Sequence, residues 1–130
     1  MASDFDVTTD IAKSPQLLYD AWLDSDGHSK MTGSPAEVSA NPGGQFKAWD
    51  GYIWGENLEL EPGKRIVQSW RTSEFTNNEE DSQIEVLFEE NETGGTKITL
   101  RHTNLPEHGA QYEQGWQESY FDPMKLYFEG

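Results

Sequence analysis

The order of its hydrophobic patterns predicts that this 130-residue chain has an α+β fold. An N-terminal strand leads into a helical stretch, several strands then follow one another, and a helix closes the chain, which is not the repeated βα order of parallel folds. The strands alternate apolar and polar side chains, as expected for an antiparallel sheet with one face in the core and one in water. The length fits one domain over residues 1–130.

The first strand is expected from about Phe5 to Ala12, where apolar and polar residues alternate. Ser14 and Pro15 are typical of an N-cap and a first helical position. Residues 24–27 (Asp-Ser-Asp-Gly) should end this first helix, and a short helical turn is expected over 28–31. The apolar side chains of the first helix lie three and four positions apart and share one face: Leu17, Leu18, Ala21 and Trp22.

A meander of strands is expected over residues 38–103, with segments near 45–49, 52–60, 65–71, 84–89 and 97–102 separated by turns rich in Gly, Pro, Asn and Asp. We expect the first strand to pair beside the strands near the C-terminal end. The concave face of the sheet should hold five apolar side chains: Ile66, Ile84, Val86, Ile98 and Leu100.

The closing helix is expected to start near Gly109 and to present an aromatic stripe. Tyr112, Trp116, Tyr120 and Met124 lie four positions apart. Pro123 removes one helical hydrogen bond and crowds the preceding turn. Either the helix kinks there or a new helix begins at 122–123, and a kinked continuous helix is favoured.

The charge of the chain limits the classes of partner. A net charge of -15 repels phosphate backbones and anionic membrane surfaces, so we expect neither nucleic acid nor membrane as a partner. The N-terminal residues lack the basic and apolar regions of a signal peptide, and cysteine is absent. We therefore expect an acidic cytoplasmic protein without disulfides.

Three segments resemble a known family. They are Pro42–Phe46 (PGGQF), Gly55–Arg71 (GENLELEPGKRIVQSWR) and the helical residues Gly115-Trp116 with 120–125 (YFDPMK). The chain resembles the heat-shock protein 90 ATPase activator homologue (C-terminal-domain-like) family of the START-like, or SRPBCC (birch-pollen-allergen-like), superfamily. The resemblance runs from about Val7 to Phe128.

The resemblance implies a helix-grip fold, in which a curved antiparallel sheet wraps a long C-terminal helix, with two short helices after the first strand. It also implies a cavity between sheet and helix that binds a small hydrophobic ligand. The alternative it implies is a co-chaperone-like interaction module that contacts a heat-shock protein 90 chaperone in a stress response, for which the acidic stretch 74–92 is a candidate surface.

Seven residues are candidates for lining this cavity: Trp54, Gln68, Trp70, Phe88, His102, Trp116 and Tyr120. Each aromatic one is also explained as ordinary core, because large rings dominate cores. Gln68 and His102 lie on the apolar faces of their strands, where they either orient a ligand or bond to a neighbour or water. An opening is expected between residues 17–31 and the end of the last helix, near Gly27 and Gly33.

No catalytic site, metal or cofactor is expected. The three histidines, His28, His102 and His108, lie in segments that imply no shared site, and no nucleophile motif or metal-ligand spacing is present. Most carboxylates fall on polar faces and turns. A cyclase-like or hydrolase-like activity, known among START-like proteins, remains the enzymatic alternative.

Overall fold

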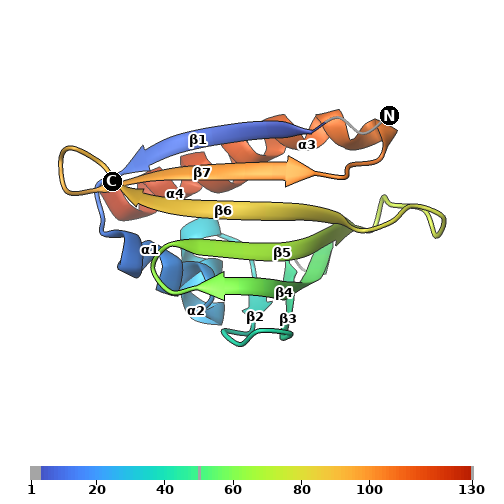
Figure 1. The fold of residues 1–130 in the computed structure, drawn as a ribbon, viewed down its shortest axis with the longest axis horizontal. Coiled ribbons are helices and arrows are strands. Elements are labelled where there is room, and N and C mark those ends of the chain that lie inside the picture. The colour runs from blue at the N-terminus through green and yellow to red at the C-terminus, as the bar shows by residue number, and fades with distance from the viewer. Residues whose placement is uncertain (1–3, 50, 130) are drawn as a thin grey trace.

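The computed structural model describes residues 4–49 and 51–129, without the side chains of Glu107 and His108. Its centre is one seven-stranded antiparallel sheet in the order β1-β7-β6-β5-β4-β3-β2 (Figure 1). The strands are β1 Phe5–Ile11, β2 Ala36–Val38, β3 Gln45–Ala48, β4 Ile53–Glu61, β5 Arg65–Thr72, β6 Ser82–Glu90 and β7 Thr96–Thr103. β1 pairs with β7, with Val7 opposite Leu100, which confirms the expected position of the first strand.

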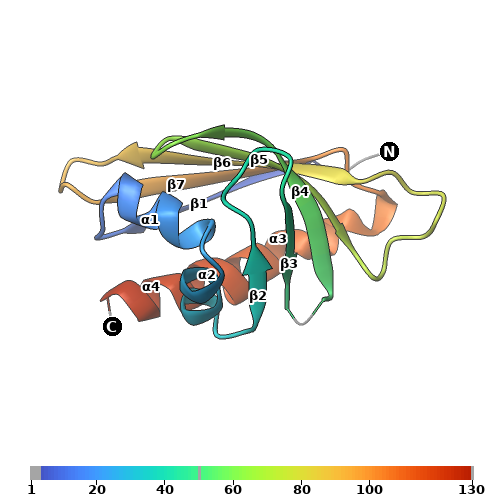
Figure 2. The same cartoon turned by 90° about the horizontal axis from the view of Figure 1, so that it is seen from below.

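All helices lie on one side of the sheet (Figure 2). They are α1 Pro15–Trp22, α2 Ser25–Thr32, a 3₁₀ turn Glu107–Ala110, α3 Gln111–Gly115, a π-helical segment Trp116–Phe121 and α4 Asp122–Glu129. The last three form one rod under the sheet, while β2, β3 and β4 curl down beside it. This is the expected helix-grip arrangement. None of the described helices is long and apolar enough to cross a membrane.

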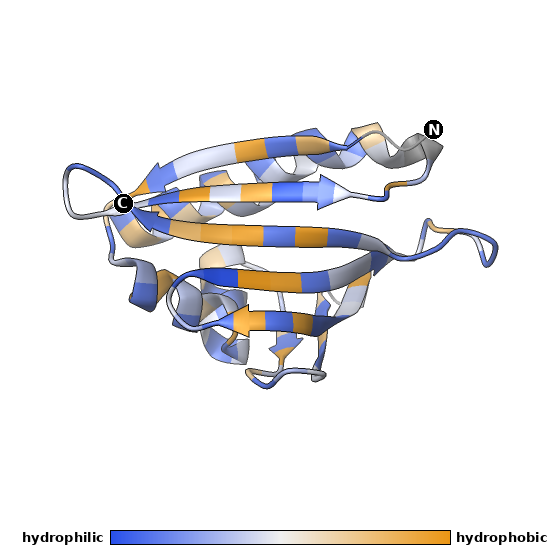
Figure 3. Cartoon of the chain, viewed as in Figure 1, coloured by the Kyte–Doolittle hydropathy of each residue, from blue (hydrophilic) through white to orange (hydrophobic). Residues whose placement is uncertain are grey.

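The core lies between the concave face and the rod. The five predicted side chains, Ile66, Ile84, Val86, Ile98 and Leu100, are fully buried, which confirms the strand phase. Their alternation with polar residues is visible as orange and blue bands along the strands (Figure 3). Burying each such side chain contributes roughly 1.5–3 kcal/mol.

The segment between α1 and β2 differs from expectation. Ser14 caps α1, its Oγ accepting from Leu17 N at 3.2 Å. Residues 24–27 do not only end that helix, because Asp24 caps α2 by accepting from Gly27 N at 2.8 Å. Gly27 thus lies inside α2, where a Cβ would come within 3.0 Å of the Ala21 backbone. It is a packing glycine and does not loosen the backbone.

The C-terminal rod is continuous, as the favoured interpretation predicted, but a π-helical segment precedes Pro123. Asp122 N bonds to the carbonyl of Gln117, five residues back. The wider turn gives the proline ring more room from the preceding carbonyls than an α turn does. The same turn carries Trp116, Tyr120 and Phe121 inward, and all three are buried.

Candidate ligand pocket

A pocket of about 470 Å³ opens where the β3–β4 hairpin faces the C-terminal rod. It has six aromatic lining residues: Trp49, Tyr52, Trp70, Tyr112, Trp116 and Tyr120. Ile53, Glu74, Gln111, Gly115 and Ser119 complete the wall. The sheet contributes Ile53 and Trp70. The hairpin contributes Trp49 and Tyr52, the turn after β5 contributes Glu74, and the C-terminal rod contributes the remaining residues.

Gly115 forms part of the wall contributed by the rod. Its backbone has ordinary right-handed helical angles, φ -59° and ψ -40°. A Cβ at this position would meet no atom within 4 Å. Glycine in a helix interior costs roughly 0.5–1 kcal/mol relative to alanine. Neither backbone conformation nor close packing therefore requires glycine here, and a larger side chain would extend into the pocket.

Glu74 brings a carboxylate to the mouth of the pocket. Its Oε2 accepts a short hydrogen bond from the Tyr52 hydroxyl and longer ones, both at 3.4 Å, from Tyr112 and Gln111. Its backbone N donates to Thr72 Oγ1 at 3.2 Å, and that hydroxyl lies 2.8 Å from the Tyr112 hydroxyl. Burial first, and then the hydrogen bond to Glu74, raise the pKa of Tyr52. The hydroxyl therefore stays protonated and donates.

Trp49 holds the hairpin side of the pocket in an uncommon backbone conformation. Its φ is 54°, in the left-handed region that non-glycine residues rarely adopt. The Tyr52 N donates to the Trp49 carbonyl at 3.1 Å, at the turn expected between segments 45–49 and 52–60, although Asp50 lies outside the described residues. The ring of Trp49 meets that of Tyr120 at 6.3 Å. Such conformations persist where the surroundings enforce them.

His102 lies behind the pocket wall in a closed network. Trp116 Nε1 donates to His102 Nδ1 at 3.0 Å, and Ser82 Oγ donates to the Trp70 carbonyl at 2.8 Å. His102 Nε2, which lies 2.8 Å from Ser82 Oγ, must therefore carry the proton and donate. Burial lowers the pKa of His102 to about 3, so the imidazole is neutral and both its nitrogens are used.

His28 forms a second network on α2, which is longer than the short helical turn expected over residues 28–31. Its Nδ1 lies 2.8 Å from the Trp22 carbonyl, which only accepts, so Nδ1 carries the proton. Its Nε2 then accepts from the Tyr120 hydroxyl at 2.9 Å. Burial lowers the pKa of His28. This histidine fixes the back of the Tyr120 ring, whose other neighbours are Trp22, Trp49 and Trp116.

Three of the seven residues proposed from the sequence line this pocket: Trp70, Trp116 and Tyr120. Gln68, Phe88 and His102 are buried but do not belong to the wall. Gln68 Nε2 donates to Asn57 Oδ1 at 2.8 Å, and Phe88 packs edge-on against Tyr19 with ring centroids 5.9 Å apart.

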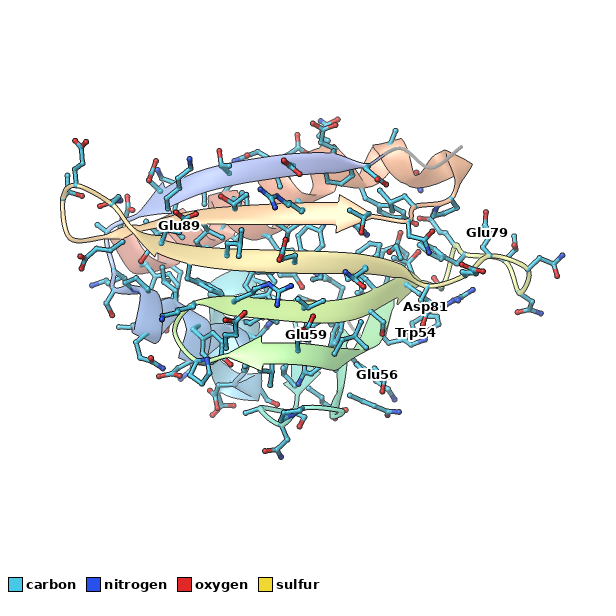
Figure 4. All side chains as sticks on the ribbon, in the orientation of Figure 1. Trp54, Glu56, Glu59, Glu79, Asp81 and Glu89 are labelled. Carbon is cyan, nitrogen blue, oxygen red and sulfur yellow. The ribbon has the colours of Figure 1, made fainter. Side chains whose placement is uncertain are left out.

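Trp54 does not line the pocket, contrary to its prediction as a cavity residue. It is 38% exposed and pairs with Arg71 on the outer face of the sheet, away from the helices (Figure 4). Ile53 and Trp54 are adjacent and both apolar, so the sequence left the phase of β4 open. The structure turns Ile53 inward. The wall does not include any residue of α1 or α2 either, so this pocket opens beside the hairpin and not near Gly27.

Sequence reasoning missed Trp49, Tyr52, Glu74 and Gly115 as members of one site. The first three lie in turns, where no period marks a face. Gly115 carried a signal, because glycine inside a strongly patterned helix calls for an explanation.

His28 and His102 each use both ring nitrogens in separate buried networks. The side chain of His108 lies outside the description. No cluster of three or more His, Asp or Glu side chains suited to a metal ion occurs within the described part of the chain. The absence of catalysis stays a prediction.

Comparison with known proteins places this geometry in a family. The family described as "Activator of Hsp90 ATPase homolog 1-like protein" matches residues 12–129. The activator of 90 kDa heat shock protein ATPase homolog from Dictyostelium discoideum is 29% identical over 116 residues, covering 88% of this chain and 30% of its own length. The human homolog 1 is also 29% identical, over 88% of this chain and 34% of its own length. The chain thus spans about a third of these relatives.

Solved structures share the fold over almost the whole chain. An HSP90 activator from Plasmodium falciparum has a TM-score of 0.86 at 26% identity and covers 95% of this chain and 94% of its own. The Aha1 dimer from Colwellia psychrerythraea has a TM-score of 0.80 at 17% identity and covers 98% and 96%. Because the family match extends over nearly all of the helix-grip fold, the chain belongs to the Hsp90 ATPase activator homolog 1-like family.

Proposed function

We propose that the pocket between the β3–β4 hairpin and the C-terminal rod binds a small, largely apolar molecule. Gly115 is the observation that carries this proposal. It costs helix stability, it relieves no clash, and the space where its Cβ would lie is open. Glycine at such a position is explained if the space itself has a use.

The size and composition of the pocket support the same conclusion. A volume of about 470 Å³ falls within the roughly 300–1,000 Å³ of small-molecule sites. Its wall is mainly aromatic with a few polar groups, which is the usual composition of such sites.

Filling the pocket from Gly115 tests the proposal. Gly115→Leu should fold at least as stably as the parent, since leucine is a better helix former by about 0.8 kcal/mol. It should nevertheless lose binding of a neutral aromatic probe, 2-phenylethanol, followed by tryptophan fluorescence and amide chemical shifts. Gly115→Ala is the matched control, because it restores helix propensity while leaving most of the space.

Comparing the three proteins distinguishes binding in this pocket from binding elsewhere on the protein. Binding to the parent and to Gly115→Ala, but not to Gly115→Leu, supports the proposal. Absence of saturable binding to the parent at millimolar probe, the weak end of useful affinity, would overturn it. Equal binding to all three proteins would place the probe elsewhere and contradict it too.

A second candidate function is contact with a heat-shock protein 90 chaperone, supported by family membership and by the names of the relatives. The outer face of the sheet is the surface we propose for it, since exposed Glu56, Glu59 and Glu89 lie there, Glu56 near Trp54 and Glu89 toward the other end of the sheet (Figure 4). Arg65 on the same face is already engaged, 2.5 Å from Glu85 and 3.2 Å from Glu61. This face therefore favours a basic partner surface.

Pull-down with a purified heat-shock protein 90 chaperone tests the second candidate. We expect capture by the parent chain and weaker capture by the double variant Glu56→Lys, Glu89→Lys. Gly115→Leu should be captured as well as the parent, because it changes the opposite side of the sheet. Failure of the parent chain to bind at low salt would contradict this candidate and leave the pocket proposal untouched.

A further inference from the structure

We propose that the pocket selects an organic cation, an amine carried on a small apolar body. This inference rests on the proposed function and names its ligand class. Two features of the wall carry it. Glu74 is its one charged residue among those described, and no lysine or arginine accompanies it. The rest of the wall is dominated by aromatic rings, whose faces attract cations.

The carboxylate of Glu74 is held in one orientation, and only one of its two oxygens accepts hydrogen bonds from described residues. In the part of the chain that the structure describes, all its side-chain hydrogen bonds reach Oε2, from Tyr52, Tyr112 and Gln111. Oε1 has no donor among the described residues. Since three neighbours hold the group in place, an incoming ammonium finds a fixed acceptor and loses less entropy than it would against a free surface carboxylate.

The two tyrosines beside Glu74 match this role. Burial raises the pKa of Tyr112, as it does that of Tyr52, so both hydroxyls remain donors at neutral pH. Donors on Oε2 fix the orientation of the carboxylate at the pocket mouth. A ligand carboxylate would face Glu74 directly, as well as the field of a chain with net charge -15.

The rings supply the second contact. Trp49 and Tyr120 meet edge to face at 6.3 Å, and Tyr120 and Trp116 lie 4.7 Å apart at a tilt. Trp49, which is half-buried, and Tyr52, which is 36% exposed, are the more accessible rings of the wall and the ones we infer to contact the cation. The nearby Arg71 does not occupy this space, because it lies over Phe75 and bonds to Asp81 at 2.6 Å.

Three probes of matched size test the inference: 2-phenylethylamine, 2-phenylethanol and 3-phenylpropionate. They share the ring and differ in the charge at the end of the chain. At pH 7.5 and 0.15 M salt we expect the amine to bind roughly tenfold more tightly than the alcohol, from one ion pair and one cation–π contact. The carboxylate should bind more weakly than the alcohol.

Glu74→Gln should reduce the preference for 2-phenylethylamine over 2-phenylethanol to within about twofold. Glutamine keeps the acceptor for Tyr52 and removes only the charge. Glu89→Gln is the matched control, because it removes the same charge from an exposed site at the far end of β6 (Figure 4) and should keep the preference. A preference shared by both variants would reflect the overall acidic field and overturn the inference.

The remaining outcomes separate the two proposals. Equal binding of amine and alcohol by the parent would overturn the cation inference and leave the proposed apolar site standing. Absence of binding by all three probes would overturn both.

Discussion

Two polar groups are associated with the tryptophans Trp70 and Trp116, and the structure treats them differently: His102 contacts both rings, and Glu74 shares the pocket wall with them. His102 is fully buried, and both its nitrogens are bonded within the protein. Glu74 is exposed at the pocket mouth, with hydrogen bonds gathered on Oε2. We call the region around His102 the closed side of the aromatic pair and the region around Glu74 its open side.

The two groups therefore have different roles in our account: His102 contributes to the stability of the fold, and Glu74 is available to a ligand. A satisfied buried network fixes one core arrangement, and breaking it leaves an unpaired polar group inside. An oriented carboxylate beside an open space contributes little to folding but is available to a ligand. Trp70 belongs to both sides, and its Nε1 is the one buried side-chain donor or acceptor atom without a partner in the described part of the chain.

The largest expected effect comes from removing the shared wall. Trp116→Ala should destabilise the fold by about 3–5 kcal/mol, because it leaves a cavity and deprives His102 Nδ1 of its donor. Against a total of roughly 5–15 kcal/mol, this threatens folding. Urea unfolding followed by circular dichroism measures it. An unchanged midpoint would show that Trp116 does not support the closed side.

Acid should weaken the closed side next. His28 and His102 both have lowered pKa values in the folded state, so below pH 6.5 the unfolded chain binds protons that the native state does not. The stability that they contribute is fully present above pH 6.5 and is lost as the pH falls toward about 3 for His102. Each contributes a slope approaching about 1.4 kcal/mol per pH unit.

The slope is best measured between pH 6.5 and 5, above the range in which carboxylates titrate. His102→Gln is the informative variant, because the amide accepts from Trp116 and donates to Ser82 without titrating. Its slope in urea midpoints should be shallower by about 1.4 kcal/mol per pH unit at most. Equal slopes in parent and variant would mean that His102 gains its proton in the native state too.

A substitution on the open side should have a smaller effect, and that effect should be on the affinity for the ligand. Trp49→Ala removes one wall and should weaken 2-phenylethanol binding roughly tenfold, about 1.4 kcal/mol. Trp54→Ala, on the neighbouring strand but on the outer face, should not change binding. Isothermal titration calorimetry compares the two. Equal losses would show that the hairpin acts through its fold and not through the Trp49 ring.

The smallest effect should be that of Glu74→Gln on folding. We expect a change within about 0.5 kcal/mol, the usual range for an exposed site, against the larger losses at Trp116. Chemical denaturation at pH 7 measures it. A loss above about 2 kcal/mol would show that Glu74 supports the fold and would remove the contrast between the two sides.

The sequence was most informative where a period and a buried face coincide. Alternation placed Ile66, Ile98 and Leu100 inward because one sheet face must be apolar. It missed β2, which is three residues long, and the extent of α2, whose sequence SDGHSKMT is mostly polar. Tertiary packing of His28 and Met31 holds that helix, and local propensity does not predict it.

The pocket was less predictable for a physical reason. Three of its eleven wall residues, Trp49, Tyr52 and Glu74, come from turns, and they join the rod in one wall only because the sheet curls toward it. His102 was expected to point inward and does so, but its partners come from β6 and the C-terminal rod. No local pattern in the sequence contains these contacts.

Nuclear magnetic resonance of the tryptophan indole N–H groups tests the open side most directly, because the five tryptophans include both wall and outer-face positions. The parent chain is titrated with 2-phenylethanol. We predict saturable shifts with one common dissociation constant for Trp49, Trp70 and Trp116, while the resonance of Trp54 stays in place. Non-saturating shifts, or a Trp54 shift as large as the others, would contradict the proposal that this pocket binds small molecules.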